Sequence, residues 1–558
     1  MKSRIIAVIL ALALAVAGVS CSTERTKAPT GKVVDTLKLA MGGATSYTQN
    51  FNPFSPAANK SPLMNLIFEP LLRVNRADEM KVQPWLAKSY DFSDDGKKLT
   101  FHLQEGVTWS DGKPFTSADV KYTLELPNTT DGLAVAPIPD LDSIETPDEH
   151  TVIINYKAPQ LHDLSNYSKI PRAIVPKHVW EKQDAVKWTN KEPVTTGAFT
   201  LESFSPQSIR LKVRDGYWNG KFNGVKHVEI KPFASEESGK QMLLKNEISW
   251  AGMSWQNYQD DFVGADPDHN KYWIYPAGFS TGLLFNMKKG PTNDVHVRRA
   301  LYAAIDADSL SKLFNSGTKT ASPTGLEPDS WGSYLPADLV DVRHQQNVEL
   351  AKSELKASSY SVKDGKLTKG GKSYPLTMTS NSDDTTWKTF GPAIKKQFKE
   401  VLGLDVKVKS IPGQQWARDL GNGDFQMIQQ YLLSGDDIWA SLNSQLNSEY
   451  LKPIGTAAVA NQGRYHNAEV DKLLQQMGQT LDEAELKKLT AAITKITTDE
   501  VPYAPLHSAA YYVNVNSTDW IGWPDPNSAD YIPHITQPVD ATITIQHLLP
   551  NPDKAAGQ

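Results

Sequence analysis

Short strand patterns alternate with amphipathic helix patterns along most of the chain, beginning near residue 36. In five segments, apolar and polar residues alternate with the period of two that a half-buried strand requires: residues 36–41, 98–103, 150–156, 208–216 and 224–233. Neither an internal repeat nor a low-complexity block interrupts this pattern. The alternation of strand and helix signals predicts an α/β protein.

Helical spacing of apolar residues, together with recognisable helix ends, marks a second set of segments. These are residues 114–126, 235–246, 294–317, 387–403 and 467–500, of which the last divides into two helices. In the first, Thr116 lies three residues before Asp119, which is an N-cap pattern, and in the third, Gly317 is placed to end the helix. A strand pattern at 404–411 directly follows the fourth helix, as in one half of a crossover unit.

The first twenty residues predict export from the cytoplasm. They combine a basic start, a short apolar run and small residues immediately before Cys21. Cys21 is the only cysteine, so it forms no internal disulfide, and its position resembles the bacterial lipoprotein box, in which the thiol is acylated. Gly18 departs from that box, which prefers Leu; the alternative is a plain secretory signal with a free thiol. We expect a lipid anchor at the outer face of the cytoplasmic membrane, followed by a flexible tether over residues 21–35.

Composition excludes some functions. The 558 residues are 40% hydrophobic and 22% charged, with a formal net charge of −5, which is ordinary for a globular chain of several domains. No long run of Lys or Arg occurs, so nucleic acid is not an expected partner. The 12 histidines form no pair at helical spacing, so we expect no metal site, and no cofactor motif is present.

One pentapeptide fits an enzyme motif. Residues 278–282, GFSTG, match the nucleophile elbow of hydrolases, but that motif requires a helix after the serine and a strand-like segment follows here. A secreted glycoside hydrolase, the remote alternative, would need two carboxylates facing each other across a cleft, and nothing among the 63 acidic residues selects such a pair. We therefore expect no catalytic activity.

Six phrases occur in a characteristic order along the chain. They are FNPFSP at 51–56, IFEPLLRVN at 67–75, the long block 83–123, IVPKHVWE at 174–181, the block 197–220 and DVHVRRALYAAIDADSL at 294–310. This succession resembles the extracytoplasmic solute-binding proteins of ABC importers, and more narrowly family 5, the class that binds peptides, nickel or oligosaccharides. The likeness runs from Thr36 to Pro550, with one departure at TTGAF, where the class more often has a Gly-Thr-Gly-Pro turn.

The resemblance implies a two-lobed periplasmic-binding-protein-like fold of class II, with an extra domain inserted in the first lobe. Its implied boundaries are residues 36–66, 195–293 and 505–558 for the first lobe, 67–194 for the inserted domain and 294–504 for the second lobe. The Pro- and Gly-bearing links at 287–294 and 499–505 would serve as hinges. Such a protein, acting as a monomer, would close on its ligand and deliver it to the permease subunits of an importer.

The aromatic residues indicate a carbohydrate ligand. The chain has 14 Trp and 20 Tyr, and several Trp stand beside Gly, Pro, Asp or Asn rather than in apolar runs: Trp255, Trp331, Trp387, Trp416, Trp439 and Trp523. An indole offers a flat apolar face and one N–H donor, which complement the C–H face and hydroxyl rim of a pyranose. The alternative is packing at a domain boundary, since Trp is usually buried.

Two phrases favour the same ligand. WIGWPDPNSADY at 520–531 and SPTGLEPDSW at 322–331 resemble the oligosaccharide-binding branch of the class. In the peptide-binding branches an aspartate of the second lobe holds the ligand's ammonium group, and Asp436 and Asp437 lie near that place, so an oligopeptide or dipeptide ligand stays open. By loop position, the resemblance implies that the indoles would stack on an oligosaccharide and that Asp437 and the asparagines would bind hydroxyls, the contacts being Tyr47, Asn52, Trp255, Trp416, Asp437, Trp439, Asn443 and Trp523.

Overall fold

The computed structural model describes residues 34–42, 45–59, 63–527 and 530–553. The predicted export signal, Cys21 and nearly all of the predicted tether lie outside these residues. Within the described part of the chain, no helix is both long enough and apolar enough to cross a membrane.

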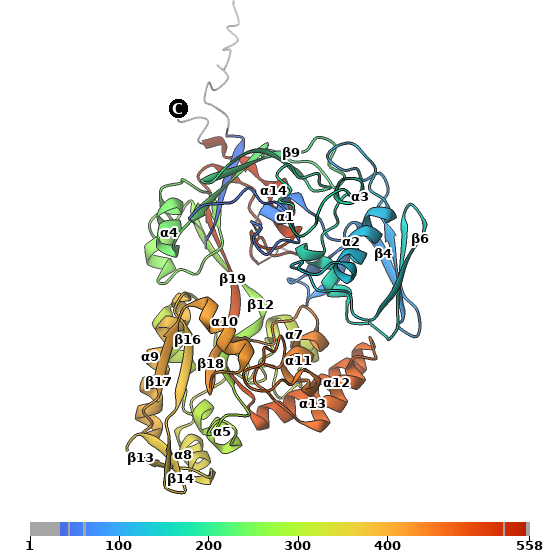
Figure 1. The fold of residues 1–558 in the computed structure, drawn as a ribbon. Helices are drawn as coiled ribbons and strands as arrows, with labels where there is room; N and C mark the ends of the chain where they lie inside the picture. The colour runs from blue at the N-terminus through green and yellow to red at the C-terminus, as the bar shows by residue number, and fades with distance from the viewer. Residues whose placement is uncertain (1–33, 43–44, 60–62, 528–529, 554–558) are drawn as a thin grey trace, which may run out of the picture.

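A ten-stranded mixed sheet extends through both lobes of the molecule (Figure 1). Its first half is the sheet of the first lobe, with strands in the order β8 (Phe199–Ser205), β9 (Ser208–Val213), β10 (His227–Phe233), β1 (Thr36–Gly42) and β11 (Trp250–Ala251). Next come β19 (Tyr503–Asn516) and β12 (Asn270–Phe285), and then the strands of the second lobe, β18 (Met427–Leu432), β16 (Thr377–Asn381) and β17 (Lys407–Ile411).

The strands β12 and β19 connect the two lobes. They pair antiparallel over almost their whole length, and β12 also pairs with β18 of the second lobe while β19 pairs with β11 of the first. Their register shifts between Pro276 and Ser280, about half-way along β12. Figure 1 shows these two strands crossing the narrow region between the lobes, where a hinge would act.

A separate antiparallel sheet lies beside the first lobe, in the order β4 (Ala87–Phe92), β5 (Lys98–Leu103), β7 (Thr151–Tyr156) and β6 (Leu141–Asp148). It packs against α2 (Ser117–Thr129), and we call residues 71–174 the side domain. These residues supply most of the shared core, which Val539 also joins. Thr116 caps α2 in a capping box with Asp119, as the sequence predicts. The exact limits of the domain predicted at 67–194 stay a proposal.

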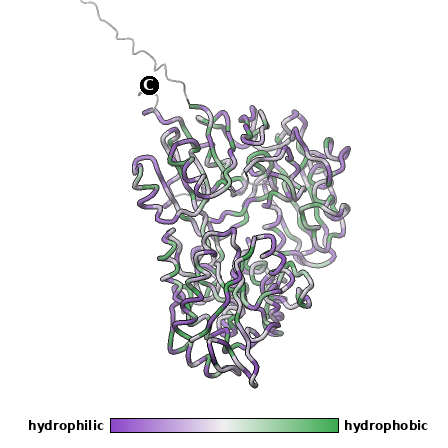
Figure 2. Tube along the Cα trace, turned by 60° about the vertical axis from the view of Figure 1, so that its left-hand side comes forward, coloured by the Kyte–Doolittle hydropathy of each residue, from purple (hydrophilic) through white to green (hydrophobic). Residues whose placement is uncertain are grey.

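The remaining elements are helices and short strands that form small sheets of their own. Beside the first lobe and side domain lie α1 (Leu63–Ile67), β2 (Leu72–Asn75), β3 (Lys81–Pro84), η1 (Leu164–Ser168), η2 (Ile170–Arg172), α3 (Lys177–Trp180), α4 (Glu236–Leu244), η3 (Gln259–Val263), β20 (Trp520–Ile521), α14 (Asp540–His547) and β21 (Leu549–Pro550). The second lobe adds α5 (Val295–Ala303), α6 (Ala307–Phe314), α7 (Pro328–Trp331), η4 (Gly332–Tyr334), α8 (Val348–Ala357), β13 (Ser361–Lys363), β14 (Lys366–Lys369), β15 (Lys372–Tyr374), α9 (Thr385–Leu402), α10 (Gly413–Asn422), α11 (Ile438–Leu446), η5 (Ser448–Tyr450), α12 (Ala468–Met477) and α13 (Glu483–Glu500). Hydrophobic and hydrophilic residues are interspersed along the chain in both lobes (Figure 2).

The five predicted strands are present as β1, β5, β7, β9 and β10, so the period-two pattern is confirmed. The prediction of one helix over 294–317 is wrong, because the segment forms two helices, α5 and α6. The break occurs where the Asp306 side chain accepts a hydrogen bond from the Ser309 amide and so starts a new helix. The helix predicted at 387–403 is α9, which ends at Gly403 in the left-handed conformation.

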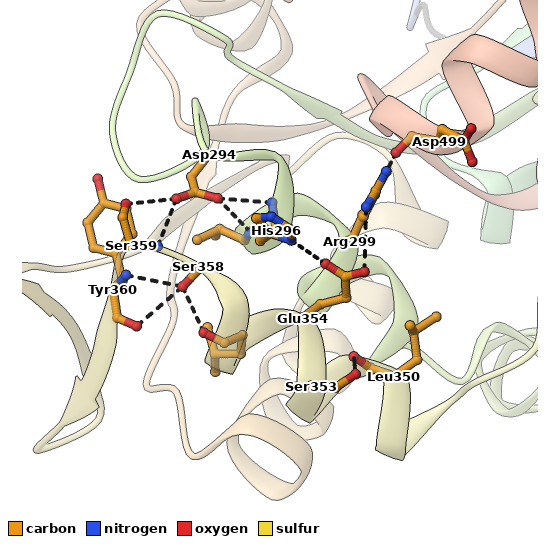
Figure 3. A network of polar contacts seen from close by, with 12 residues as sticks. Asp294, His296, Arg299, Leu350, Ser353, Glu354, Ser358, Ser359, Tyr360 and Asp499 are labelled. Carbon is orange, nitrogen blue, oxygen red and sulfur yellow. Dashed lines mark hydrogen bonds and ion pairs between the residues drawn. The ribbon is translucent and has the colours of Figure 1, made fainter.

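The chain that leaves β12 is fixed to the second lobe by a polar network (Figure 3). Asp294 caps α5 and also accepts hydrogen bonds from the amide and hydroxyl of Ser359. Glu354 of α8 pairs with His296 at 2.6 Å and with Arg299 at 3.6 Å. Arg299 Nε in turn donates to the carbonyl oxygen of Asp499, just before β19, so both chain crossings are tied to the same helices.

Candidate functional site

A cavity of about 930 Å³ lies between the two lobes. The first lobe contributes residues from the ends of β1, β10 and β11, and the second lobe contributes the end of β16, the start of α9 and the end of β18. The hinge strands β12 and β19 supply the wall between them. The carboxyl ends of strands are where open α/β sheets place their ligands, so this cavity is the candidate ligand site.

Aromatic rings form one side of the cavity. The Trp387 ring lies 5.1 Å from that of Tyr431, and the Phe279 ring lies 5.8 Å from that of Tyr431. Trp387 is buried, whereas Tyr431 keeps 44% of its surface exposed, which is unusual for so large a side chain. Tyr511 and Tyr512 of β19 also line the cavity. An exposed ring on a rigid strand is suited to stack on a flat apolar ligand surface.

Acceptor groups face the cavity from the starts of two helices, one in each lobe. Glu236 lies in the first turn of α4, and Asp384 is the N-cap of α9, where it accepts a hydrogen bond from the Trp387 amide. Thr385 Oγ1 donates to Glu236 Oε2 at 3.2 Å, which is a direct contact between the lobes. Burial raises the pKa of both carboxyls. Among the described residues that line the cavity, none is Lys or Arg.

Two buried histidines also line the cavity, at its hinge wall and on the first lobe. Burial lowers the pKa of His507 and of His534 to about 3, so both rings are neutral near pH 7. Ser508, the neighbour of His507 on β19, donates to the carboxylate of Glu327 behind the strand. The cavity therefore offers carboxylates, hydroxyls and neutral imidazoles rather than cationic groups.

None of the eight residues predicted to contact ligand lines this cavity. Trp416 comes nearest, because its ring packs at 5.3 Å against that of Trp387, while its N–H donates to the carbonyl oxygen of Gln429. Trp255 is buried and stacks at 4.4 Å on Phe262. Contact of Trp255 and Trp416 with a ligand stays a prediction.

Three other predicted contacts lie on the first lobe, in structural positions. Asn52 is fully buried, and its Nδ2 donates to the carbonyl oxygens of Ala185 and Trp188. Tyr47 is half-buried against the core of the first lobe. Trp523 packs against Trp250 at 5.6 Å, and its N–H donates to the carbonyl oxygen of Trp520. Trp520 and Trp523, the two indoles of the phrase at 520–531, thus pack within the first lobe. Contact of Tyr47, Asn52 and Trp523 with a ligand stays a prediction.

The last three predicted contacts are brought together at α11 of the second lobe. Asp437 caps the helix by accepting from the Ala440 amide, and Trp439 and Asn443 follow on it. Trp439 stacks on His162, and Asn443 donates to the Tyr450 hydroxyl. Their proximity to each other is observed; their contact with ligand stays a prediction.

The residues of the cavity itself were only partly visible in the sequence. Trp387 belongs to the polar-flanked Trp set, and DDTTW carries a helix N-cap signal directly after a strand, which is the signature of a strand end in a crossover unit. Glu236 has a similar signal in SEESG. Tyr431 has none, because its place depends on the pairing of β18 with β12.

Comparison with known proteins was made by family model, by curated relatives and by solved structures. Residues 81–449 match the model of the bacterial extracellular solute-binding proteins, family 5. A probable D,D-dipeptide-binding periplasmic protein of Escherichia coli is 26% identical over 77% of this chain and 80% of its own. A periplasmic oligopeptide-binding protein of Thermotoga maritima has the same fold, with a TM-score of 0.84, 24% identity and coverage of 93% and 99%. The mannohexaose-bound structure of the same Thermotoga maritima protein has a TM-score of 0.78 and 23% identity. The match covers 94% of this chain and 100% of that chain.

Proposed function

The chain belongs to the bacterial extracellular solute-binding proteins of family 5, which serve ABC importers and are not enzymes, and we propose that its ligand is an oligosaccharide. The two lobes would close on the sugar about β12 and β19 and present it to the permease subunits. The observation that carries this proposal is the composition of the cavity, in which an aromatic wall faces hydrogen-bonding groups and no described lining residue is Lys or Arg.

A pyranose matches this lining group by group. Its C–H face can stack on the exposed ring of Tyr431, and its hydroxyls can donate to Glu236 and Asp384, which accept without requiring a charged partner. The neutral rings of His507 and His534 add no positive charge to the lining. A neutral polar ligand is therefore favoured over an anionic one.

A peptide is the second candidate, because relatives of this chain are named for peptide ligands. A free peptide carries a terminal carboxylate, which the described lining of the cavity meets with no cationic side chain. The two aspartates considered for its ammonium group are already engaged within the protein, Asp436 by Arg76 at 2.5 Å and Asp437 by His162 at 3.1 Å. Glu236 and Asp384 of the cavity could accept hydrogen bonds from an ammonium group, so the argument for the sugar over the peptide rests on the missing partner for the terminal carboxylate.

The proposal is tested by isothermal titration calorimetry, with tryptophan fluorescence as a second signal. The ligand panel contains neutral α- and β-linked oligosaccharides of two to six units and di- to pentapeptides. We expect saturable binding of at least one oligosaccharide. Binding of peptides alone would replace the proposal by the second candidate, and cleavage of a bound sugar would contradict a receptor role.

Replacing Tyr431 with Ala is expected to weaken sugar binding about tenfold, the value of one lost ring contact of about 1.4 kcal/mol. The half-exposed ring contributes little to the core, so the fold should persist. Calorimetry on the variant measures the loss. The matched control is Tyr374→Ala on β15, whose ring packs against Tyr360 and does not line the cavity; equal losses in both variants would disprove a ring contact at Tyr431.

We also propose that Cys21 carries the lipid anchor, on the sequence pattern alone. Replacing Cys21 with Ser removes the thiol that acylation requires and is expected to move most of the protein from the membrane fraction to the soluble fraction. Immunoblotting of the fractions measures this shift. Membrane retention equal to that of the unaltered protein would contradict acylation at this residue.

A further inference from the structure

His162 of the side domain inserts between two helices of the second lobe. Its side chain is 2% exposed, although it stands at a junction between separate parts of the chain. Nδ1 lies 3.1 Å from both carboxylate oxygens of Asp437 at the start of α11. Nε2 lies 2.9 Å from the carbonyl oxygen of Met477 and 3.1 Å from that of Thr480, at the end of α12. The ring also stacks on Trp439 at 5.1 Å.

The partners on both sides of this ring are hydrogen-bond acceptors. A carboxylate and a carbonyl oxygen accept hydrogen bonds and donate none, whereas a neutral imidazole has one N–H and one lone pair. In either neutral tautomer, one ring nitrogen would direct its lone pair at a buried oxygen. Only the imidazolium, with an N–H on each nitrogen, satisfies Asp437 and the two carbonyls together.

The charged groups around the ring leave Asp437 as its counter-ion. Asp436, the preceding residue of the second lobe, pairs with Arg76 at 2.5 Å and with Lys169 at 3.9 Å. On the side domain, Asp163 pairs with Arg172 at 3.2 Å. The phenol of Tyr334 is a further titratable neighbour of Asp437.

We propose that His162, protonated on both ring nitrogens, is a latch that holds the side domain against the second lobe in the closed form, and that deprotonation at alkaline pH weakens it. The latch rests on the proposed closure about the hinge strands, since opening the lobes would separate His162 from α11 and α12. The Arg76–Asp436 pair lies at the same junction, and the Arg76 guanidinium keeps its charge when His162 loses its proton.

The direction of the pH effect follows from the contacts. Burial lowers the pKa of His162, but the hydrogen bond and charge of Asp437 outweigh it and raise the pKa above the ordinary value. A raised pKa in the closed form means that the latch is complete below about pH 6.5 and is lost as pH rises through the raised value. Closure and ligand retention should therefore weaken between neutral and alkaline pH.

The first test needs no ligand. Small-angle X-ray scattering of the unaltered protein at pH 6.5 and pH 9 is expected to show a larger radius of gyration at pH 9, while His162→Gln should be expanded at both. Asp437→Asn keeps an N-cap on α11 and should also remove the pH effect. The control is His178→Gln, which breaks a pair with Asp111 at 2.8 Å outside this junction and should behave like the unaltered protein.

Trp439 supplies a spectroscopic signal for the same event. Its fluorescence should change with pH through the titration of the stacked ring, and both Trp439→Phe and His162→Gln should abolish that transition. With the tightest ligand of the panel, affinity should fall about fivefold from pH 6.5 to pH 9 in the unaltered protein and stay flat in His162→Gln. Identical scattering and fluorescence of unaltered protein and His162→Gln across this range would overturn the latch. A pH effect in a protein that binds no sugar would support the latch and contradict the proposal that the ligand is an oligosaccharide.

Discussion

Replacing Glu69 with Leu is expected to lower the free energy of unfolding by about 4 kcal/mol, because it removes one acceptor from several buried donors. Glu69 is 5% exposed. Its Oε1 accepts from Trp85 Nε1 at 2.9 Å and from the Tyr217 hydroxyl at 2.7 Å, and its Oε2 accepts from Trp218 Nε1 at 3.1 Å. One carboxylate thus ties the side domain to the loop after β9, and explains the Glu in the IFEPLLRVN phrase.

Urea denaturation of the Leu variant measures this loss. Glu69→Gln keeps one carbonyl acceptor but turns an NH₂ donor toward one of the two indole N–H groups, so an intermediate loss of about 2 kcal/mol is expected. Glu181→Leu, at an exposed position at the end of α3, is the control and should change stability by less than about 0.5 kcal/mol. If the Leu variant were as stable as that control, the indole N–H groups and the Tyr217 hydroxyl would be donating to water in place of Glu69.

Local patterns in the sequence predicted the secondary-structure elements well, whereas the predicted ligand contacts lie outside the cavity and stay predictions. The strand at 98–103 is present as β5 with the predicted bounds, because alternation of apolar residues is a local property. The break between α5 and α6 was missed, since Asp306 caps a helix start within an otherwise helical pattern. Which polar and aromatic residues share a cavity depends on strand pairing between distant segments, which one sequence does not specify.

Trp255 and Trp387 show this limit directly. Both stand among polar residues in the sequence, so the pattern treats them alike. The ring of Trp255 stacks on Phe262 of the π-helix η3, whereas Trp387 lies at the start of α9 beside Tyr431 of β18. Polar neighbours in the sequence indicate that a Trp lies at the end of a helix or strand. They do not indicate whether its ring packs in the core or lines the cavity.

Replacing Glu327 with Gln is expected to stabilise the protein at alkaline pH. Glu327 caps α7 behind the hinge strand β19 and is 2% exposed, and burial raises the pKa of its carboxyl to about 7, although the Ser508 hydroxyl donates to it. A carboxyl with a raised pKa in the folded state favours folding fully below the unfolded value, near pH 4.5, and this contribution is lost as pH rises through 7. Above that pH, the folded protein carries a buried charge next to its hinge.

The amide of Gln has no charge to bury, so Glu327→Gln should be more stable than the unaltered protein by about 3 kcal/mol at pH 8.5 and nearly equal to it at pH 5. Urea denaturation at the two pH values measures the difference, with Glu349→Gln at the exposed start of α8 as the control. A Gln variant less stable at pH 8.5 would mean that the carboxylate is satisfied there. The hydrogen bond from Ser508 would then offset the cost of burying this charge beside the hinge strand.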